Sequence, residues 1–275
     1  MKGLSVLGMM MVTLGSFAIA FSASAGQRPA STIKPAPSAA QALSKEQADA
    51  TPINEEKMLE LFAQNYNTKQ ELVELQNKTL AQAGKAVPAL IKVMKESKYP
   101  DKNRWMATFL VGRIMGKKAG PFISKFLKHP NWVLRMASLK TLLALREEQY
   151  GSLFAGALKD KSLIVRTQAL ENIHRLDLKE HAANVWEMLY DKRNYYSEKE
   201  GERTNIIRKV ITVVGDLRFD KAKDPLLKMI QKEKYQDIFG ELDYSLGKIT
   251  GKKSPEGEKA KKFFWNRVAM ADTVI

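Results

Sequence analysis

A helical hairpin recurs along the chain about every 31 residues, and this period is the feature that most constrains the fold. In three copies an arginine stands in the second helix, and a small residue follows three positions later, where two helices must approach closely. These pairs are Arg104 with Ala107, Arg135 with Ser138, and Arg166 with Ala169. The first helices keep a similar period through a row of apolar residues: Leu90, Ile123, Phe154, Val185 and Leu227. Two sets of helices with one shared period predict stacked helical pairs, each of which contacts mainly its neighbours.

The stretch from Ala119 to Arg146 contains one complete hairpin. Apolar residues recur at helical spacing from Phe122 in the first half and from Leu134 in the second half. Pro130 and Asn131 separate the halves, because such a pair favours a turn. A single hairpin cannot bury its apolar face alone, so the repeats are expected to cover one another.

The predicted fold is all-α: an α-solenoid over residues 53–272, with about five hairpins and capping helices at both ends. Asn54 before two glutamates is typical of a helix start, and one or two amphipathic helices are expected up to about Ala83. Residues 256–271 predict a basic amphipathic helix that caps the last hairpin, with attachment to a membrane surface as the alternative. Three tryptophans fall at helix-packing or turn positions and are expected in the core: Trp105, Trp132 and Trp186.

The second and third copies resemble HEAT repeats. The residues that carry the resemblance are Pro121, Leu127, Pro130, Leu134, Arg135, Ser138 and Leu139 in one copy, and Leu158, Lys159, Asp160, Val165, Arg166, Ala169 and Leu170 in the next. The ending from Leu246 to Lys252, with Trp265 after it, is similar to the end of many bacterial HEAT-repeat proteins. The resemblance covers residues 84–269. It implies a scaffold that mainly binds other proteins.

The chain departs from the HEAT pattern in its turns. The turn aspartate expected to pair with the helix arginine is present at Asp160, whereas the matching positions hold His129 and Lys98. We therefore expect most of the aspartate–arginine ladder to be missing. Packing between hairpins is then expected to rest on apolar contacts.

Residues 1–25 have the pattern of a secretory signal peptide. Lys2 supplies the positive start, an apolar stretch runs to Phe21, and residues 23–25 (Ala-Ser-Ala) form a small-residue cleavage site. We expect cleavage after Ala25 and export to the periplasm or the medium, with a retained membrane anchor as the alternative. Residues 26–52 are rich in Ala, Ser, Gln and Pro, a composition that predicts a disordered linker.

The charge balance favours anionic partners. Lys and Arg number 45 against 30 Asp and Glu, which gives a formal net charge of +15. Nucleic acid, phospholipid head groups, lipopolysaccharide and acidic polymers all fit such a charge. The chain contains no cysteine, so disulfides, thiol nucleophiles and cysteine-ligated metals are excluded.

Two basic rows follow the repeat. The row Arg104, Arg135 and Arg166 fits either an anion contact or hydrogen bonds to carbonyl groups between repeats, and we favour the structural role. The second row stands five residues after the aligned apolar position of the first helices, with Tyr190 as an interruption: Lys95, Lys128, Lys159 and Lys232. Lysines near helix C-termini oppose the helix dipole, but they also predict a basic stripe along one edge that contacts a partner.

The fourth hairpin carries an insertion at residues 190–203. Insertions in repeat arrays lie in loops, and loops carry function more often than the scaffold does. Tyr195 and Tyr196, beside Arg193 and other charged residues, are therefore predicted to anchor a partner at an interface. A tolerated, solvated insertion is the alternative.

The sequence predicts no catalytic residues, metal site or cofactor. It contains no nucleophile elbow, phosphate-binding glycine loop or spaced carboxylate pair, and His129, His174 and His181 form no ligand set. We therefore predict a non-enzymatic scaffold of the bacterial envelope that binds a protein or an anionic envelope polymer or lipid. HEAT-like arrays also include DNA glycosylases, which makes an enzyme the first alternative, although the export signal argues against nucleic acid. A charge-driven polyanion or lipid binder is the second alternative.

Overall fold

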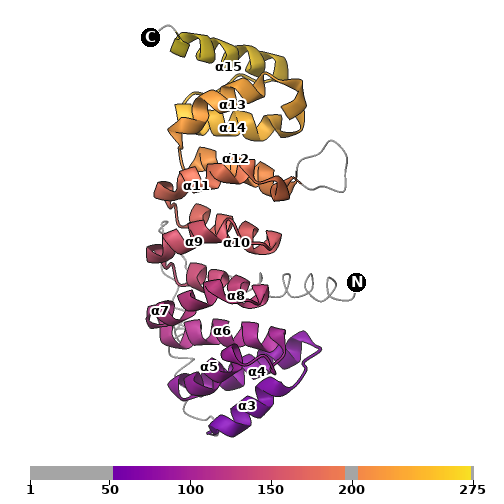
Figure 1. The fold of residues 1–275 in the computed structure, drawn as a ribbon, viewed down its shortest axis with the longest axis vertical. Helices are drawn as coiled ribbons and strands as arrows, with labels where there is room; N and C mark the ends of the chain where they lie inside the picture. The colour runs from indigo at the N-terminus through magenta and orange to yellow at the C-terminus, as the bar shows by residue number, and fades with distance from the viewer. Residues whose placement is uncertain (1–51, 196–203, 274–275) are drawn as a thin grey trace, which may run out of the picture. The chain divides into compact units, whose positions relative to one another are not determined.

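The computed structural model describes residues 52–195 and 204–273, and every regular element in these ranges is a helix (Figure 1). The predicted all-α solenoid is confirmed. The predicted signal peptide, the linker up to residue 51, and Tyr196 lie outside the described residues. The described residues divide between Ala89 and Leu90 into two compact units, each with its own internal packing.

In the first unit the helices are α3 (Glu55–Ala63), α4 (Lys69–Ala81) and the short η1 (Ala83–Ala86). Asn54 caps α3 as predicted, because its side chain accepts a hydrogen bond from the Lys57 N–H at 2.8 Å. Helix α4 begins with a capping box between Thr68 and Glu71. The buried side chains of the two helices form the core of this unit: Met58, Phe62, Leu75, Gln76 and Thr79.

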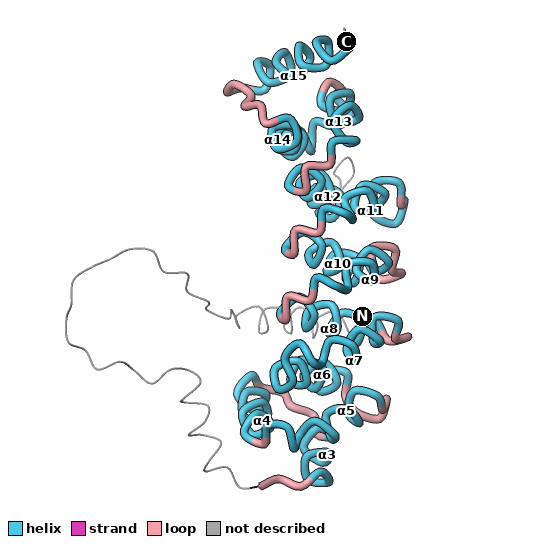
Figure 2. The backbone as a smooth tube through the Cα atoms, turned by 90° about the vertical axis from the view of Figure 1, so that its left-hand side faces the viewer, coloured by secondary structure: helices cyan, strands magenta, loops and turns pink. Residues whose placement is uncertain are grey.

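The second unit consists of successive hairpins, and α5 leads into it from the first unit. The first helices are α5 (Val87–Lys95), α7 (Gly120–Ile123) with η3 (Ser124–Lys128), α9 (Gly151–Ala157), α11 (Ala182–Glu187) with η6 (Met188–Tyr190), and α13 (Lys223–Ile230). The second helices are α6 (Asp101–Met115), α8 (Trp132–Ala144), α10 (Leu163–Arg175), α12 (Asn205–Asp216) and α14 (Phe239–Thr250). Figure 2 shows α7, α9 and α11 in one column and α8, α10 and α12 in another.

The second helices pack closely where the sequence places small residues. Ala107, Ser138 and Ala169 are completely buried, as the repeat predicts. The backbones of α12 and α14 also approach closely, since a Cβ atom added to Gly215 would stand 2.6 Å from Ser245 Cα. Only glycine fits at that distance, because the neighbour is backbone that cannot move aside.

Several second helices end in the same left-handed turn. Arg146, Asp177 and Arg218 have φ values of 52°, 51° and 53°. The N–H of the next residue reaches back to a carbonyl five positions earlier, as in the 3.0 Å bond from Leu178 to Ile173. This pattern is a Schellman motif, which closes a helix and redirects the chain. Short 3-10 turns then lead into the next hairpin: η2 (Gly116–Ala119), η4 (Glu148–Tyr150), η5 (Lys179–His181) and η8 (Asp220–Ala222).

Helix α15 (Glu258–Thr273) packs against α13, which confirms the predicted capping helix. Trp265 is completely buried, and its Nε1–H donates a 2.7 Å hydrogen bond to Asp243 Oδ1 on α14. Phe263 on the same helix is 66% exposed. Neither α15 nor any other helix in the described ranges is long and apolar enough to cross a membrane.

The predicted burial of the tryptophans is only partly correct. Trp105 is buried, whereas Trp132 and Trp186 are half-buried. Trp132 is the first residue of α8, and Trp186 is close to the C-terminal end of α11. Side chains at helix ends are covered by one neighbouring turn instead of two, so these rings remain partly accessible.

Candidate functional site

The connections between the first and second helix of each hairpin lie along one edge of the second unit, here called the turn edge. It comprises residues 96–100, 129–131, 158–162, 191–195 and 231–238. Both basic rows predicted from the sequence lead to this edge. The structure assigns them different roles.

The arginine row is structural, as favoured from the sequence. Arg104, Arg135 and Arg166 are between 2% and 5% exposed. Arg104 donates to the Met94 carbonyl oxygen at 3.0 Å, and Arg135 donates to the carbonyl oxygens of His129 and Pro130 at 2.8 and 2.9 Å. Their donors are therefore used to hold turns, and an external anion would have to displace these bonds.

Arg135 also reaches into the following hairpin. Its guanidinium donates two hydrogen bonds to Asp160, at 2.6 and 2.7 Å. Burial raises the pKa of the Asp160 carboxyl, but the hydrogen bonds from Arg135 and from the Ser162 N–H outweigh it and leave the pKa below its usual value. A bidentate pair of this kind fixes one hairpin on the next.

Two further arginines make equivalent links, so the prediction that packing between hairpins rests on apolar contacts alone was wrong. Arg166 donates to the buried Asn194 at 2.8 Å and to the Arg193 carbonyl oxygen at 3.2 Å. Arg208, one residue out of register, pairs with Glu241 at 3.0 Å and with Asp237 at 3.6 Å. Asparagine and glutamate thus replace the aspartate that the HEAT pattern led us to expect.

The lysine row is exposed along its whole length. Lys95 and Lys128 are the last residues of α5 and η3, and Lys159 and Lys232 follow α9 and α13 closely, so each stands where a positive charge opposes the helix dipole. Lys159 pairs with Glu187 at 3.0 Å. Within residues 52–195 and 204–273, Lys128 and Lys232 have no ion pair. Their charges are accessible to a partner.

In the described part of the insertion, Tyr190 is exposed to solvent, whereas Tyr195 is hydrogen-bonded to the backbone. Tyr190 is 73% exposed and accepts a 3.2 Å hydrogen bond from Trp186 Nε1–H. Tyr195 is 41% exposed, and its hydroxyl donates to the Leu189 carbonyl oxygen at 2.6 Å. The role of Tyr196 stays a prediction. Tyr190 entered the sequence argument as the residue that interrupts the lysine row and as the first residue of the insertion, but not as an anchor.

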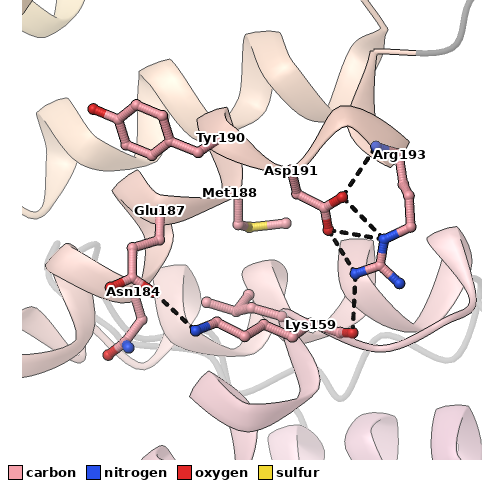
Figure 3. A pocket seen from close by; sticks show the side chains of 8 residues that line it. Lys159, Asn184, Glu187, Met188, Tyr190, Asp191 and Arg193 are labelled. Carbon is pink, nitrogen blue, oxygen red and sulfur yellow. Dashed lines mark hydrogen bonds and ion pairs between the residues drawn. The ribbon is translucent and has the colours of Figure 1, made fainter.

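A pocket of about 370 Å³ opens on the turn edge beneath Tyr190 (Figure 3). It lies between the end of α9 and the end of α11, so two successive hairpins build it. Its lining residues are Leu158, Lys159, Asn184, Glu187, Met188, Tyr190, Asp191 and Arg193. The pocket therefore joins Lys159 of the lysine row to Arg193 of the insertion, two residues that the sequence suggested separately.

Two ion pairs flank the pocket. The first joins Lys159 to Glu187, and the second joins Arg193 to Asp191 at 2.6 Å. Arg193 also donates to the Lys159 carbonyl oxygen at 3.3 Å, which ties the insertion to the preceding turn. The hydrogen bond from Arg193 lowers the pKa of Asp191, so this carboxyl is ionised at neutral pH.

Nothing in the sequence marked Asn184, Glu187 and Met188 as site residues, whereas Asp191 belongs to the predicted insertion. They lie on α11 and just after it, and become neighbours of Lys159 only when the hairpins stack. In the described ranges, no group of three or more His, Asp or Glu is placed to hold a metal ion.

Residues 87–192 match the family model of HEAT repeats, which agrees with the resemblance seen in the second and third hairpins. The matched residues include every residue of the pocket except Arg193. No curated protein sequence matches the chain. The family match supports a HEAT-repeat protein, and repeats of this kind commonly serve as scaffolds for protein interactions.

Proposed function

We propose that this α-solenoid of HEAT-like hairpins is a non-enzymatic scaffold of the bacterial envelope, which binds a protein partner along its turn edge. One observation carries the proposal: the arginines of the row are buried and used in bonds within and between hairpins, whereas the lysines beside them are exposed. The pocket opens on the same edge. The edge thus combines a rigid frame, accessible charge and a recess for a side chain.

The insertion in the fourth hairpin also favours the turn edge as the binding surface. It adds an exposed tyrosine at position 190 and a half-exposed one at position 195 beside the pocket. Tyrosine offers a large contact area for a modest loss of side-chain entropy, which suits an anchor in an interface. The exposed lysines raise the rate of encounter with an acidic surface more than they strengthen the final complex.

The envelope location rests on the signal-like residues 1–25. N-terminal sequencing of the protein from fractionated cells tests it. A mature chain that begins at Gly26 in the periplasmic fraction is the expected result. A chain with Met1 intact in the membrane fraction would contradict cleavage, and a cytoplasmic chain would reopen the DNA-binding alternative.

Binding to an anionic envelope polymer or lipid is the second candidate, favoured by the net charge of +15. Co-purification from envelope extracts at low and high salt, with partners identified by mass spectrometry, distinguishes the two. A defined protein retained at high salt supports the scaffold. Recovery of lipopolysaccharide or acidic polymer at low salt only supports the polyanion binder, because exposed charges are screened by salt.

A double variant tests the contribution of the insertion. We expect Tyr195→Ala with Tyr196→Ala to accelerate dissociation of the recovered protein at any salt concentration. Unchanged dissociation would show that the insertion is passive, and the exposed faces of the second helices would become the better candidate.

A further inference from the structure

We propose that the pocket between α9 and α11 binds an aromatic side chain of a protein partner, carried in a segment with acidic residues around it. This inference rests on the proposed scaffold function and specifies the partner that the turn edge takes. It gives the pocket a chemical role that neither the repeat pattern nor the family match assigns.

The floor of the pocket is apolar. Leu158 and Met188 line it and are only 2% and 3% exposed, so they form a fixed surface. Figure 3 shows Met188 between the two ion pairs, with Tyr190 above it. A methionine thioether packs favourably against an aromatic ring, and its flexible chain adapts to the shape of the ring. An inserted ring would contact Met188 from one side and the exposed Tyr190 from the other.

The charges at the pocket argue against a small anion as its ligand. Lys159 is already paired with Glu187, and Arg193 is already paired with Asp191. The two cations are thus matched by two carboxylates, and an anion between them would face both carboxylates. An uncharged ring leaves both pairs intact and covers their aliphatic parts, which strengthens rather than breaks them.

Unpaired cations lie near the pocket without lining it. Lys161 and Lys192 are exposed on the two turns that carry pocket residues, and Lys128 is exposed at the end of η3 in the preceding hairpin. None of the three forms an ion pair within the described part of the chain. Acidic residues on either side of the inserted ring would form ion pairs with these lysines. The exposed lysines therefore favour a partner segment with acidic residues, and the apolar floor of the pocket favours an aromatic ring at its centre.

Short fluorescein-labelled peptides of Glu, Ser and Gly with one central Phe test the proposal on the purified chain by fluorescence anisotropy. Two control peptides carry Ala in place of Phe, or Lys in place of Glu. We expect the Phe peptide to bind at least about tenfold more tightly than either control. Equal binding of the Phe and Ala peptides would overturn the aromatic anchor, and equal binding of the Lys peptide would overturn the acidic flank.

A matched pair of variants locates the binding site. Asn184→Trp fills the pocket from its wall, whereas Ala183→Trp adds the same ring at an exposed neighbour that does not line the pocket. The first is expected to weaken binding of the Phe peptide about tenfold or more, and the second to leave it unchanged. Binding that survives Asn184→Trp would place the peptide elsewhere.

A readout on the unmodified chain keeps the test valid if Asn184→Trp unfolds the protein. With methyl-labelled methionine, N-acetyl-phenylalaninamide should shift the Met188 methyl resonance in a saturable manner, and acetate should not. No shift, or a shift with acetate alone, would overturn the proposal. These probes do not need the natural partner, so their failure would leave a co-purified protein, and hence the scaffold function, in place.

Discussion

Glu147 occupies a position that other hairpins fill with an apolar residue. It follows the left-handed Arg146, as Leu178 follows Asp177 and Phe219 follows Arg218. The Glu147 side chain is 2% exposed, and Oε2 accepts a 2.6 Å hydrogen bond from Gln149 Nε2. Oε1 has no hydrogen-bond partner in the described part of the chain. Such a buried, half-satisfied carboxylate costs stability.

We therefore expect Glu147→Leu to raise the free energy of unfolding by about 1–3 kcal/mol, because it removes the unsatisfied oxygen and restores the apolar contact of the Schellman motif. Urea denaturation followed by circular dichroism measures the change. Glu148→Leu is the control, since its side chain is exposed and its unfolding free energy should barely change. A less stable Glu147→Leu protein would show that the carboxylate makes a needed contact.

Helices α12 and α14 depend on one glycine for their contact. Gly215→Ala would place a methyl group 2.6 Å from Ser245 Cα, so the two helices must separate. Overpacking of this kind lowers the free energy of unfolding by about 1–3 kcal/mol. Thermal or urea unfolding measures the loss.

A second glycine provides the matched control for Gly215→Ala. Gly240 lies in α14 with nothing within 4 Å of an added Cβ. Gly240→Ala should therefore stabilise the protein by up to about 1 kcal/mol through helix propensity. If both variants shift stability in the same direction, the close approach of α12 and α14 is not what the geometry indicates.

The same two helices share a hydrogen bond that titrates. The Tyr244 hydroxyl donates to Asp216 Oδ1 at 2.6 Å, and this bond raises the pKa of Tyr244 to about 12. Because the folded pKa lies above the ordinary value of about 10, the bond stabilises the fold fully below pH 10. That contribution is lost as the pH rises from 10 to 12.

Ultraviolet difference titration against Tyr244→Phe should reveal one tyrosine with a midpoint near pH 12. Asp216→Asn should move this midpoint back toward the ordinary value, because the negative acceptor is gone. A midpoint near 10 in the unmodified chain would mean that the bond between α12 and α14 does not form in solution.

The helices and their buried faces could be predicted wherever the same type of residue recurs at the same position of successive hairpins. Ala169 recurs in register with Ala107, so its burial between two second helices could be foreseen. The partner of Asp160 could not be predicted in this way, because Arg135 belongs to the preceding hairpin and the pairing depends on how the hairpins stack. The pocket could not be predicted from the sequence for the same reason. Met188 and Leu158 are far apart in sequence and resemble any other apolar helix residues until the stack brings them together.

At the scale of the whole molecule, the two edges of the second unit can be compared by charge. Exchange of all four residues of the lysine row (Lys95, Lys128, Lys159 and Lys232) for Gln should slow association with the recovered partner at low salt and change dissociation little. The difference should shrink at high salt, where the Debye length is short. Surface plasmon resonance at several salt concentrations separates the two rates.

The control for this variant removes the same charge from the connections between hairpins. Lys117, Lys118, Lys179 and Lys221 are all exposed there. Their exchange for Gln lowers the net charge equally and should leave the association rate nearly unchanged. If both variants slow association to the same extent, the net charge of the protein attracts the partner, and the position of the lysines is not important.

Three arginine links between hairpins run in the same direction along the chain, whereas the 3.3 Å bond from Arg193 to the Lys159 carbonyl oxygen runs in the other. Arg135, Arg166 and Arg208 each find their acceptors in the hairpin that follows, at Asp160, Asn194 and Glu241. A hairpin that has just emerged from the ribosome therefore lacks some of the acceptors of its arginine until the next hairpin folds. The order of the links along the chain therefore matters. Loss of hairpins from the C-terminal side leaves a guanidinium without its acceptor in the next hairpin, whereas loss from the N-terminal side leaves only the acceptor without its donor.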